Sequence, residues 1–273
     1  MIRHPKYNWK LMQFSILNGV PGIRHFSTSR RGGVSRGEYR AFNLGINTGD
    51  QPERVRRNYT KLAEMLNCEI DDIIVPLQIH GSDILLIDND FVQLHKTLRE
   101  EWLRGFDAII SQQKNLFFCV ATADCVPILL YDFKTKAVAV IHAGWRGTVD
   151  KIVEKTITAM QENFGTVPKN LLAAIGPAIG IKNYEVGNEV VQKFREAGFT
   201  FNERTYRDLY RDGRIHLDLK GINHHELIRL GIPKDQIEKA RFNTFDNEGL
   251  FFSARRQSEN TGRMLTGIML VDE

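Results

Sequence analysis

The sequence predicts an α+β fold in which a single layered domain is built around mixed β-sheets flanked by helices. Helical and strand-like patterns are interspersed along the 273 residues instead of being segregated. Several strand-like runs follow one another between residues 73 and 142 without helices between them, which argues against a doubly wound parallel sheet. No internal repeat, proline-rich linker or low-complexity tract divides the chain, so we expect residues 1–273 to form one domain.

Short apolar runs rich in Val, Ile, Leu or Phe predict the strands. These runs cover residues 11–17, 73–79, 84–88, 107–110, 116–122, 127–132, 136–142, 169–175, 240–245 and 264–271. Apolar residues at helical spacing predict helices. The helices cover residues 53–67, 148–164, 185–197 and 218–230. The polar, basic stretch 28–41 predicts a loop, either solvated and flexible or a lid that binds an anion over a site.

Composition narrows the class of protein. Thirty-seven basic and 33 acidic residues give a net charge of +4, which is a weak case for nucleic-acid binding. The N-terminus has no apolar stretch long enough for a signal peptide, and no run approaches the length of a membrane span. Three cysteines favour reduced thiols over a disulfide framework. We therefore expect a cytoplasmic protein that binds neither nucleic acid nor membranes.

Residues 137–149, AVAVIHAGWRGTV, predict a buried strand, a tight turn and then a helix. His142 ends the strand, and Gly144 and Gly147 bracket the turn. Such a junction brings backbone N–H groups and a helix N-terminus together, where they favour an anion. The stretch therefore suits a functional site, although a core histidine beside a packing turn also explains it and is favoured on this stretch alone.

Two further residues end strand-like runs in the same way. His80 lies in PLQIHGSDI, and Cys125 closes CVATADC. Because strand ends in one sheet can converge, these residues and His142 form a candidate zinc site with a fourth position left open. Their spacings match no compact zinc-finger pattern. Two alternatives stay open: Cys125 as a nucleophile with His142 or His80 as its base, and a buried cysteine with two packing histidines.

Six strings carry a resemblance to a known family. In chain order they are QIHGSDI, DAIIS, TADCVPILLYD, AVAVIHAGWRG, AAIGPAIG…YEVG and FFSARR…TGRM. They resemble the YfiH-like family, also called laccase-domain or polyphenol oxidase proteins, from about residue 42 to the C-terminus. The resemblance implies a YfiH-like fold, which is related to the catalytic fold of cytotoxic necrotising factor.

The same resemblance implies a purine nucleoside phosphorylase that converts adenosine, inosine and methylthioadenosine to free base and ribose 1-phosphate. Adenosine deaminase activity is also attributed to this family. Its zinc ligands correspond to His80, Cys125 and His142. Copper is less expected, because only two of the eight histidines are obviously placed at a site and Asn243 stands where many members carry a second cysteine.

Phosphorolysis needs cations and N–H donors for phosphate, together with a proton for the departing purine. Arg146 is the first phosphate candidate, with packing on Trp145 or pairing with an acid as its alternative. Arg255 and Arg256 form a second cationic patch, in which one arginine should face solvent because neighbouring strand residues point to opposite faces. The expected catalytic residues are Cys125, His80, His142, Asp124 and Arg146.

Asp124 is the acid/base candidate nearest to Cys125 in sequence, with a structural role as its alternative. Asn43 is a candidate hydrogen-bond partner of the substrate, with turn formation as its alternative. Ser253 offers a hydroxyl donor beside the two arginines. The expected substrate-binding residues are Asn43, Arg146, Ser253, Arg255 and Arg256.

Two other functions compete with phosphorolysis. The first, which the family resemblance also implies, is a cysteine-dependent hydrolase or amidase that acts on peptidoglycan precursors, with Cys125 as nucleophile. The second is a metal-stapled interaction module without catalysis, against which the lack of an evident fourth ligand counts. The expected partners are a purine nucleoside, phosphate and at most a weakly associated second copy of the chain.

Overall fold

The computed structural model describes residues 1–4, 6–201, 208–211, 213–258 and 260–272. Its two large sheets each contain six strands, and both mix parallel and antiparallel pairs. The first sheet has the order β1 (Ile2–His4), β2 (Asn8–Gln13), β3 (Ile23–Thr28), β15 (Met264–Leu270), β7 (Phe117–Thr122), β4 (Ile73–Ile74). The second has the order β14 (Ile237–Lys239), β10 (Leu171–Ile175), β8 (Val126–Asp132), β9 (Ala137–Ala143), β6 (Ala108–Ser111), β5 (Ile84–Ile87).

A small third sheet and the helices complete the fold. The small sheet has the order β11 (Glu185–Val186), β13 (Arg214–Leu217), β12 (Asp208–Arg211). The helices are α1 (Pro52–Leu66), α2 (Asn89–Gln93), α3 (Lys96–Trp102), α4 (Trp145–Val149), α5 (Ile152–Phe164), α6 (Asn188–Glu196), α7 (Leu219–Arg229) and α8 (Ala254–Gln257). Short 3-10 turns lie at Gly37–Tyr39, Ile70–Asp72, Pro168–Asn170 and Lys234–Gln236. None of the helices within the described residues is long and apolar enough to cross a membrane.

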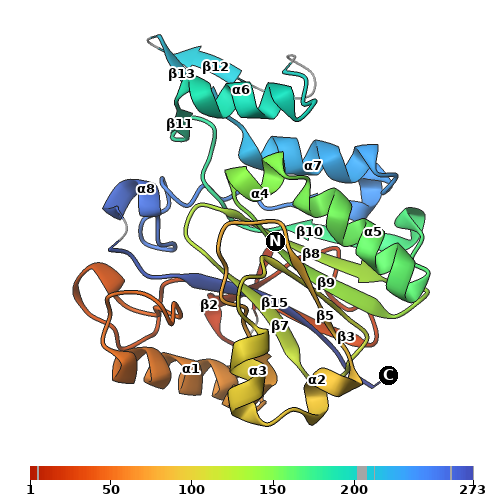
Figure 1. The fold of residues 1–273 in the computed structure, drawn as a ribbon. Coiled ribbons are helices and arrows are strands. Elements are labelled where there is room, and N and C mark those ends of the chain that lie inside the picture. The colour runs from red at the N-terminus through yellow and green to blue at the C-terminus, as the bar shows by residue number, and fades with distance from the viewer. Residues whose placement is uncertain (5, 202–207, 212, 259, 273) are drawn as a thin grey trace.

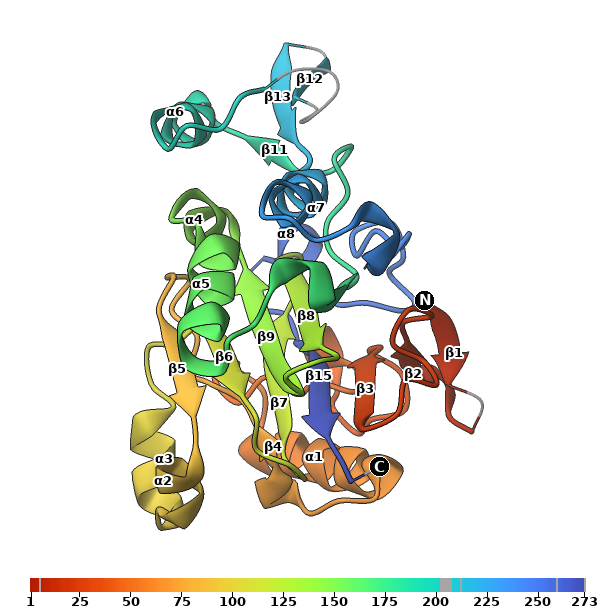
Figure 2. The same cartoon turned by 90° about the vertical axis from the view of Figure 1, so that its right-hand side faces the viewer.

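The two large sheets pack face to face between layers of helices (Figures 1 and 2). Strand β7 shows how alternation builds these layers. Its Phe117 and Cys119 pack against α1, whereas Phe118 and Val120 pack in the core between the two sheets. The small sheet and α6 lie at the opposite end of the molecule from α1 (Figure 1). The predicted class, mixed sheets flanked by helices, is therefore confirmed.

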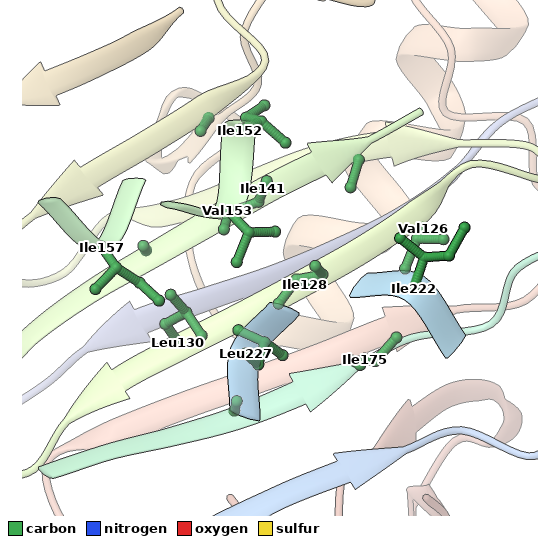
Figure 3. Close-up of a cluster of buried hydrophobic side chains, with 14 of the residues drawn as sticks. Val126, Ile128, Leu130, Ile141, Ile152, Val153, Ile157, Ile175, Ile222 and Leu227 are labelled. Atoms are coloured by element: carbon green, nitrogen blue, oxygen red, sulfur yellow. The ribbon is translucent and has the colours of Figure 1, made fainter. Parts of the chain in front are cut away.

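The outer face of the second sheet is covered by α5 and α7. Figure 3 shows Ile128 and Leu130 of β8 among Ile157 of α5 and Leu227 of α7. Full burial of each such side chain contributes about 1.5–3 kcal/mol. This cluster anchors both helices on the sheet whose strand ends carry the candidate site.

The same alternation explains where His142 points. In β9, Ile141 belongs to the core under the helices, whereas Val138 and Val140 belong to the core between the sheets. His142 continues the second series, so its side chain lies at the end of the space between the sheets. Pro127 of β8 pairs with His142, which places Cys125 beside the end of β9.

Some predicted elements differ from the structure. Residues 240–245 form no strand, and β14 ends at Lys239. The predicted helix 148–164 begins earlier as α4 and is broken at Lys151, whose φ of 61° is left-handed. Strand β3 was not predicted, because its arginine, histidine and serine make it look polar. Its His25 is nevertheless buried, and its Nε2 accepts a hydrogen bond from the Phe14 amide.

Candidate functional site

The structure brings together three residues that lie far apart in sequence. His80 lies in the loop between β4 and β5, Cys125 in the turn before β8, and His142 near the end of β9. Their nitrogen and sulfur ligand atoms all lie within 4.8 Å of one another. The two imidazole rings meet edge to face, with centroids 4.9 Å apart. His80 is exposed and His142 is buried, so the cluster lies at the surface end of the space between the sheets.

Two residues of this cluster region have left-handed backbones. The φ angle is 62° at His80 and 87° at Asp124, which precedes Cys125. Non-glycine residues adopt this region only where the surroundings impose it, at a cost of about 1–3 kcal/mol each. Both conformations are tied down by hydrogen bonds to buried carboxylates.

Asp107 supplies the first of these carboxylates, and its sequence position alone predicted no role for it. Its Oδ1 accepts a hydrogen bond from His142 Nδ1 at 2.7 Å, and its two oxygens also accept from the amides of residues 79–81. Since an ionised carboxylate only accepts, His142 carries a proton on Nδ1 and turns Nε2 towards the cluster. Asp107 is the first residue of the DAIIS string. It could have been proposed from the sequence as a partner of His142, because a metal-binding histidine usually donates its second ring N–H to a carboxylate.

The charges of the cluster favour a thiolate at Cys125. Burial raises the pKa of the Cys125 thiol, but the charge of His142 and hydrogen bonds from His142 and His80 outweigh it and bring that pKa to about 6. Burial lowers the pKa of His142, but the opposing effects of Cys125 and Asp107 are larger and raise that pKa to about 9. Burial also raises the pKa of Asp107, but its hydrogen bonds hold it below its ordinary value. The thiolate is the form of cysteine that binds metals or attacks substrates.

Two glycines leave room for the cluster. A Cβ atom on Gly144 would lie 3.3 Å from Cys125 Sγ and 3.4 Å from His80 Cδ2. A Cβ atom on Gly147 would lie 2.5 Å from the carbonyl oxygen of Gly81, in the loop that carries His80. A side chain at either position would therefore press on a residue of the cluster or on the loop that carries His80.

The cluster fits a metal ion. Zinc bonds of about 2.0–2.3 Å to nitrogen and sulfur place tetrahedral donors roughly 3.5 Å apart, which small side-chain shifts reach from the present separations. Two imidazoles and a thiolate suit zinc, and they also suit copper(I). Among the described residues the group has three members, so a fourth position is open to a ligand from the cavity.

A cavity of about 700 Å³ opens onto this cluster. Besides the three clustered residues, it is lined by two aromatic and three arginine side chains: Trp145, Tyr184, Arg146, Arg255 and Arg263. Residues 44–48 form a further part of its wall. Arg146 packs over Trp145, with its guanidinium carbon 4.4 Å from the ring centre, and it also faces the cavity. Tyr184 and Arg263 were not assigned as site residues, although both lie in strings that carry the family resemblance.

The two predicted arginines of the FFSARR string diverge, but not on a strand. They lie in the short helix α8, where successive side chains point in different directions because each residue is rotated about the helix axis by roughly 100° relative to the one before it. Arg255 lines the cavity, lies over the Tyr184 ring and donates to the Glu185 carbonyl oxygen at 2.7 Å. Arg256 instead donates to the backbone carbonyls of residues 244, 245 and 251.

Asp124 supplies the second buried carboxylate of the site. It accepts hydrogen bonds from the Thr244 hydroxyl, the Ser253 hydroxyl at 2.9 Å and the Arg255 amide at 2.7 Å. Ser253 is fully buried, accepts from the Arg256 amide and caps α8, so it does not line the cavity. Asp124 lines the cavity, but its carboxylate is already engaged in holding α8 against the turn that carries Cys125.

Asn43 lies behind the cavity wall instead of in its lining. It is fully buried; its amide nitrogen donates to Thr48 and Asp50, and its oxygen accepts from the amides of Gly45 and Arg263. Its side chain therefore shapes the loop that forms this wall, as the turn-forming alternative anticipated. The amide of Thr148, in the turn after His142 where an anion was expected, is likewise engaged, because it donates to the Gly144 carbonyl oxygen.

Comparisons with known proteins agree with this architecture. The family model described as "Multi-copper polyphenol oxidoreductase laccase" matches residues 24–271. A purine nucleoside phosphorylase from Bacteroides thetaiotaomicron is 40% identical over 96% of each chain, and Adenosine deaminase RL5 from an unknown prokaryotic organism is 36% identical over 95% of this chain and 98% of its own. The crystal structure of hypothetical protein YfiH from Bacillus licheniformis matches with a TM-score of 0.87 at 29% identity, covering 96% of this chain and 97% of that one. YlmD from Geobacillus stearothermophilus matches with a TM-score of 0.84 at 29% identity, covering 96% and 99%.

Proposed function

Because the chain belongs to the multi-copper polyphenol oxidoreductase laccase family, also called YfiH-like, we propose that it is a zinc-dependent purine nucleoside phosphorylase with a secondary adenosine deaminase activity. We assign adenosine, inosine and methylthioadenosine as substrates, from which phosphate releases the free base and a ribose 1-phosphate. The names of the relatives support an enzyme that acts on purine nucleosides. The observation that carries the proposal is the His80, Cys125 and His142 cluster at a cavity that also holds Arg146 and Arg255.

We assign the phosphate to Arg146 and Arg255. Both guanidinium groups line the cavity, and neither forms an ion pair with an acidic side chain in the part of the chain that the structure describes. Planar guanidinium groups bind phosphate through paired N–H donors. Arg263 adds positive charge to the same cavity. The three arginines thus provide the cationic surroundings that a phosphate nucleophile needs before it can approach the ribose.

We assign the purine to the aromatic part of the cavity. Trp145 and Tyr184 both line it, and flat aromatic rings stack on purine bases. Asp124 is a poor candidate for protonating the departing base, because its carboxylate accepts three hydrogen bonds from residues that hold α8. We therefore assign Asp124 the task of aiming Arg255 into the cavity.

His80, Cys125 and His142 would hold the zinc ion, which supplies a Lewis acid next to the cavity. The lowered pKa of Cys125 keeps its sulfur deprotonated near neutral pH, as metal binding requires. Asp107 keeps the Nδ1 proton on His142 and leaves Nε2 free to bind the ion. Multi-copper oxidation needs several more histidines than this cluster provides. A thiol ligand also fits the reducing cytoplasm expected for this chain.

One observation favours a second candidate function. The Cys125 sulfur lies within 4.8 Å of a His142 ring nitrogen, and His142 in turn is hydrogen-bonded to Asp107. This order resembles the nucleophile, base and orienting acid of cysteine hydrolases. In that case the chain would be a cysteine-dependent hydrolase or amidase with peptidoglycan precursors as substrates. Its activity would survive removal of metal and would be lost when the Cys125 thiol is alkylated.

The two functions separate in one set of assays. Zinc-loaded protein is incubated with adenosine, inosine and methylthioadenosine, with and without phosphate, beside a chelated sample and the variants Cys125→Ala and Cys68→Ala. The phosphorylase account expects phosphate-dependent release of base, which chelation and Cys125→Ala abolish and Cys68→Ala leaves unchanged, since Cys68 lies outside the cavity. Inert nucleosides, or activity that survives chelation but not alkylation, would reject it.

A further inference from the structure

We propose that Asp107 is a positioning residue that locks two of the three clustered residues, His80 and His142, into a single metal-binding arrangement. The inference rests on the proposed function in taking these residues as metal ligands. Asp107 does not line the cavity and touches no expected substrate, so it would act only through the residues it holds.

The first half of this lock is made to His142. Asp107 lies just before β6, where Ala108 pairs with Ile141 of β9, so it stands opposite His142 across the two strands. Its carbonyl oxygen accepts a hydrogen bond from the His142 amide at 2.7 Å, and its carboxylate accepts from His142 Nδ1 at the same distance. Both the backbone and the ring of His142 are therefore fixed by this one residue.

The second half is made to the loop that carries His80. The carboxylate accepts three amide hydrogen bonds, from Ile79 at 3.2 Å, His80 at 3.1 Å and Gly81 at 2.7 Å. Successive amides that converge on one anion form a backbone nest. The nest holds His80 in its left-handed conformation, which directs its exposed side chain towards Cys125.

The arrangement requires that both carboxylate oxygens of Asp107 accept hydrogen bonds. Oδ1 serves His142 and His80, and Oδ2 serves Ile79 and Gly81, so all four partners are donors. An asparagine has one acceptor and one NH₂ donor, which must face one of these pairs in either orientation. If the NH₂ group faces His142, it favours the ring form with a proton on Nε2, which leaves no lone pair on the nitrogen that faces the cluster. If it faces the loop, it repels the amides that position His80.

The test compares Asp107→Asn and Asp107→Glu with a matched control, Asp132→Asn. Asp132 is also a fully buried aspartate of the second sheet and also accepts backbone amides, from Lys134 and Thr135, but in the turn between β8 and β9. Zinc affinity is measured by competition with a chromophoric chelator, and the visible spectrum of the cobalt-substituted protein reports the ligand geometry. Circular dichroism of the metal-free proteins checks that each variant folds.

We expect Asp107→Asn to weaken zinc binding about 10–100-fold and to change the cobalt spectrum. Asp107→Glu should recover part of the affinity because it restores two acceptors, and Asp132→Asn should bind zinc as the unmodified chain does. Folded Asp107→Asn protein with unchanged affinity and spectrum would overturn the inference.

A measurement that needs no metal separates this inference from the proposed function. Nuclear magnetic resonance of the unmodified chain should show a hydrogen-bonded Nδ1 proton on His142, shifted to low field. Absence of that proton would overturn the role of Asp107 even if zinc binds. Its presence in a chain that binds no zinc would support the lock while rejecting the zinc-dependent phosphorylase.

Discussion

At the scale of single residues, Cys125 differs from the other two cysteines in its charged surroundings. His142 and His80 lower its pKa to about 6, whereas burial raises the pKa of Cys68 to about 11 and that of Cys119 well above its ordinary value. One cysteine of three is therefore poised to be a thiolate near neutral pH.

This contrast predicts a pH dependence for alkylation of the metal-free protein. Because the Cys125 pKa is depressed, its thiolate predominates above about pH 6 and is lost as the pH falls through that value. The rate of reaction with iodoacetamide, followed by peptide mass spectrometry, should rise to a plateau with a midpoint near pH 6. Cys68 serves as an internal control and should react slowly below about pH 9. A Cys125 midpoint at its ordinary value near 9 would contradict the ion pair with His142.

The two cavity arginines give a second prediction at this scale. Arg146→Gln and Arg255→Gln should each raise the KM for phosphate about 10–100-fold, because a hydrogen bond to a charged group contributes about 1.5–3 kcal/mol. The KM for nucleoside should change much less. Arg57→Gln, at an exposed position of α1, is the control and should behave as the unmodified chain does. Equal losses for phosphate and nucleoside would show that these arginines do not select the phosphate.

Residue roles were only partly predictable from sequence. His80, Cys125 and His142 could be grouped because each follows an apolar strand. The positions of Asp107 and Tyr184 at the site could not be predicted, since they depend on contacts between strands and loops that are distant in sequence. Asn43 and Ser253 have polar side chains that suit substrate binding, but the fold buries both and uses them to shape loops.

Among the elements, α4 lies close against the loop that carries His80, and Gly147 makes this close approach possible. Gly147→Ala would place a Cβ atom 2.5 Å from the Gly81 carbonyl oxygen, so the loop must move. We expect this variant to lose zinc affinity about 10-fold or more while it stays folded, as measured by chelator competition and circular dichroism. The control is Gly249→Ala, where the nearest atom is the flexible end of Arg31 at 3.4 Å. Unchanged affinity in Gly147→Ala would show that the loop position does not govern the site.

Elements with a clear apolar pattern were predicted well. Strands β7, β8 and β9 are apolar on both faces because each lies between two cores, and their predicted runs agree closely with the structure. Strand β3 was not predicted, because its polar residues His25 and Ser27 are buried with hydrogen-bond partners, and a hydropathy pattern does not reveal such partners. The run 240–245 was predicted as a strand but forms none. Two of its carbonyl oxygens accept hydrogen bonds from the Lys220 side chain instead of from a neighbouring strand.

In the whole molecule, single strands contribute side chains to two neighbouring hydrophobic cores, one on each face of their sheet. We therefore predict that residues 1–273 unfold as one cooperative unit. Thermal unfolding should give one transition with the same midpoint by circular dichroism and tryptophan fluorescence. Zinc at 100 times its Kd should stabilise the chain by about 2.7 kcal/mol, which raises the Tm by roughly 5–10 °C. Cys125→Ala should show no such shift. Two separate transitions would contradict a single domain.

We propose that this cavity transfers a ribosyl group from a purine to phosphate. The most direct test follows inorganic phosphate by ³¹P nuclear magnetic resonance while the zinc-loaded protein acts on inosine. We expect the phosphate signal to be replaced by that of ribose 1-phosphate, in equal amount to the hypoxanthine released. Hypoxanthine without ribose 1-phosphate, or no reaction with inosine, adenosine or methylthioadenosine, would contradict it.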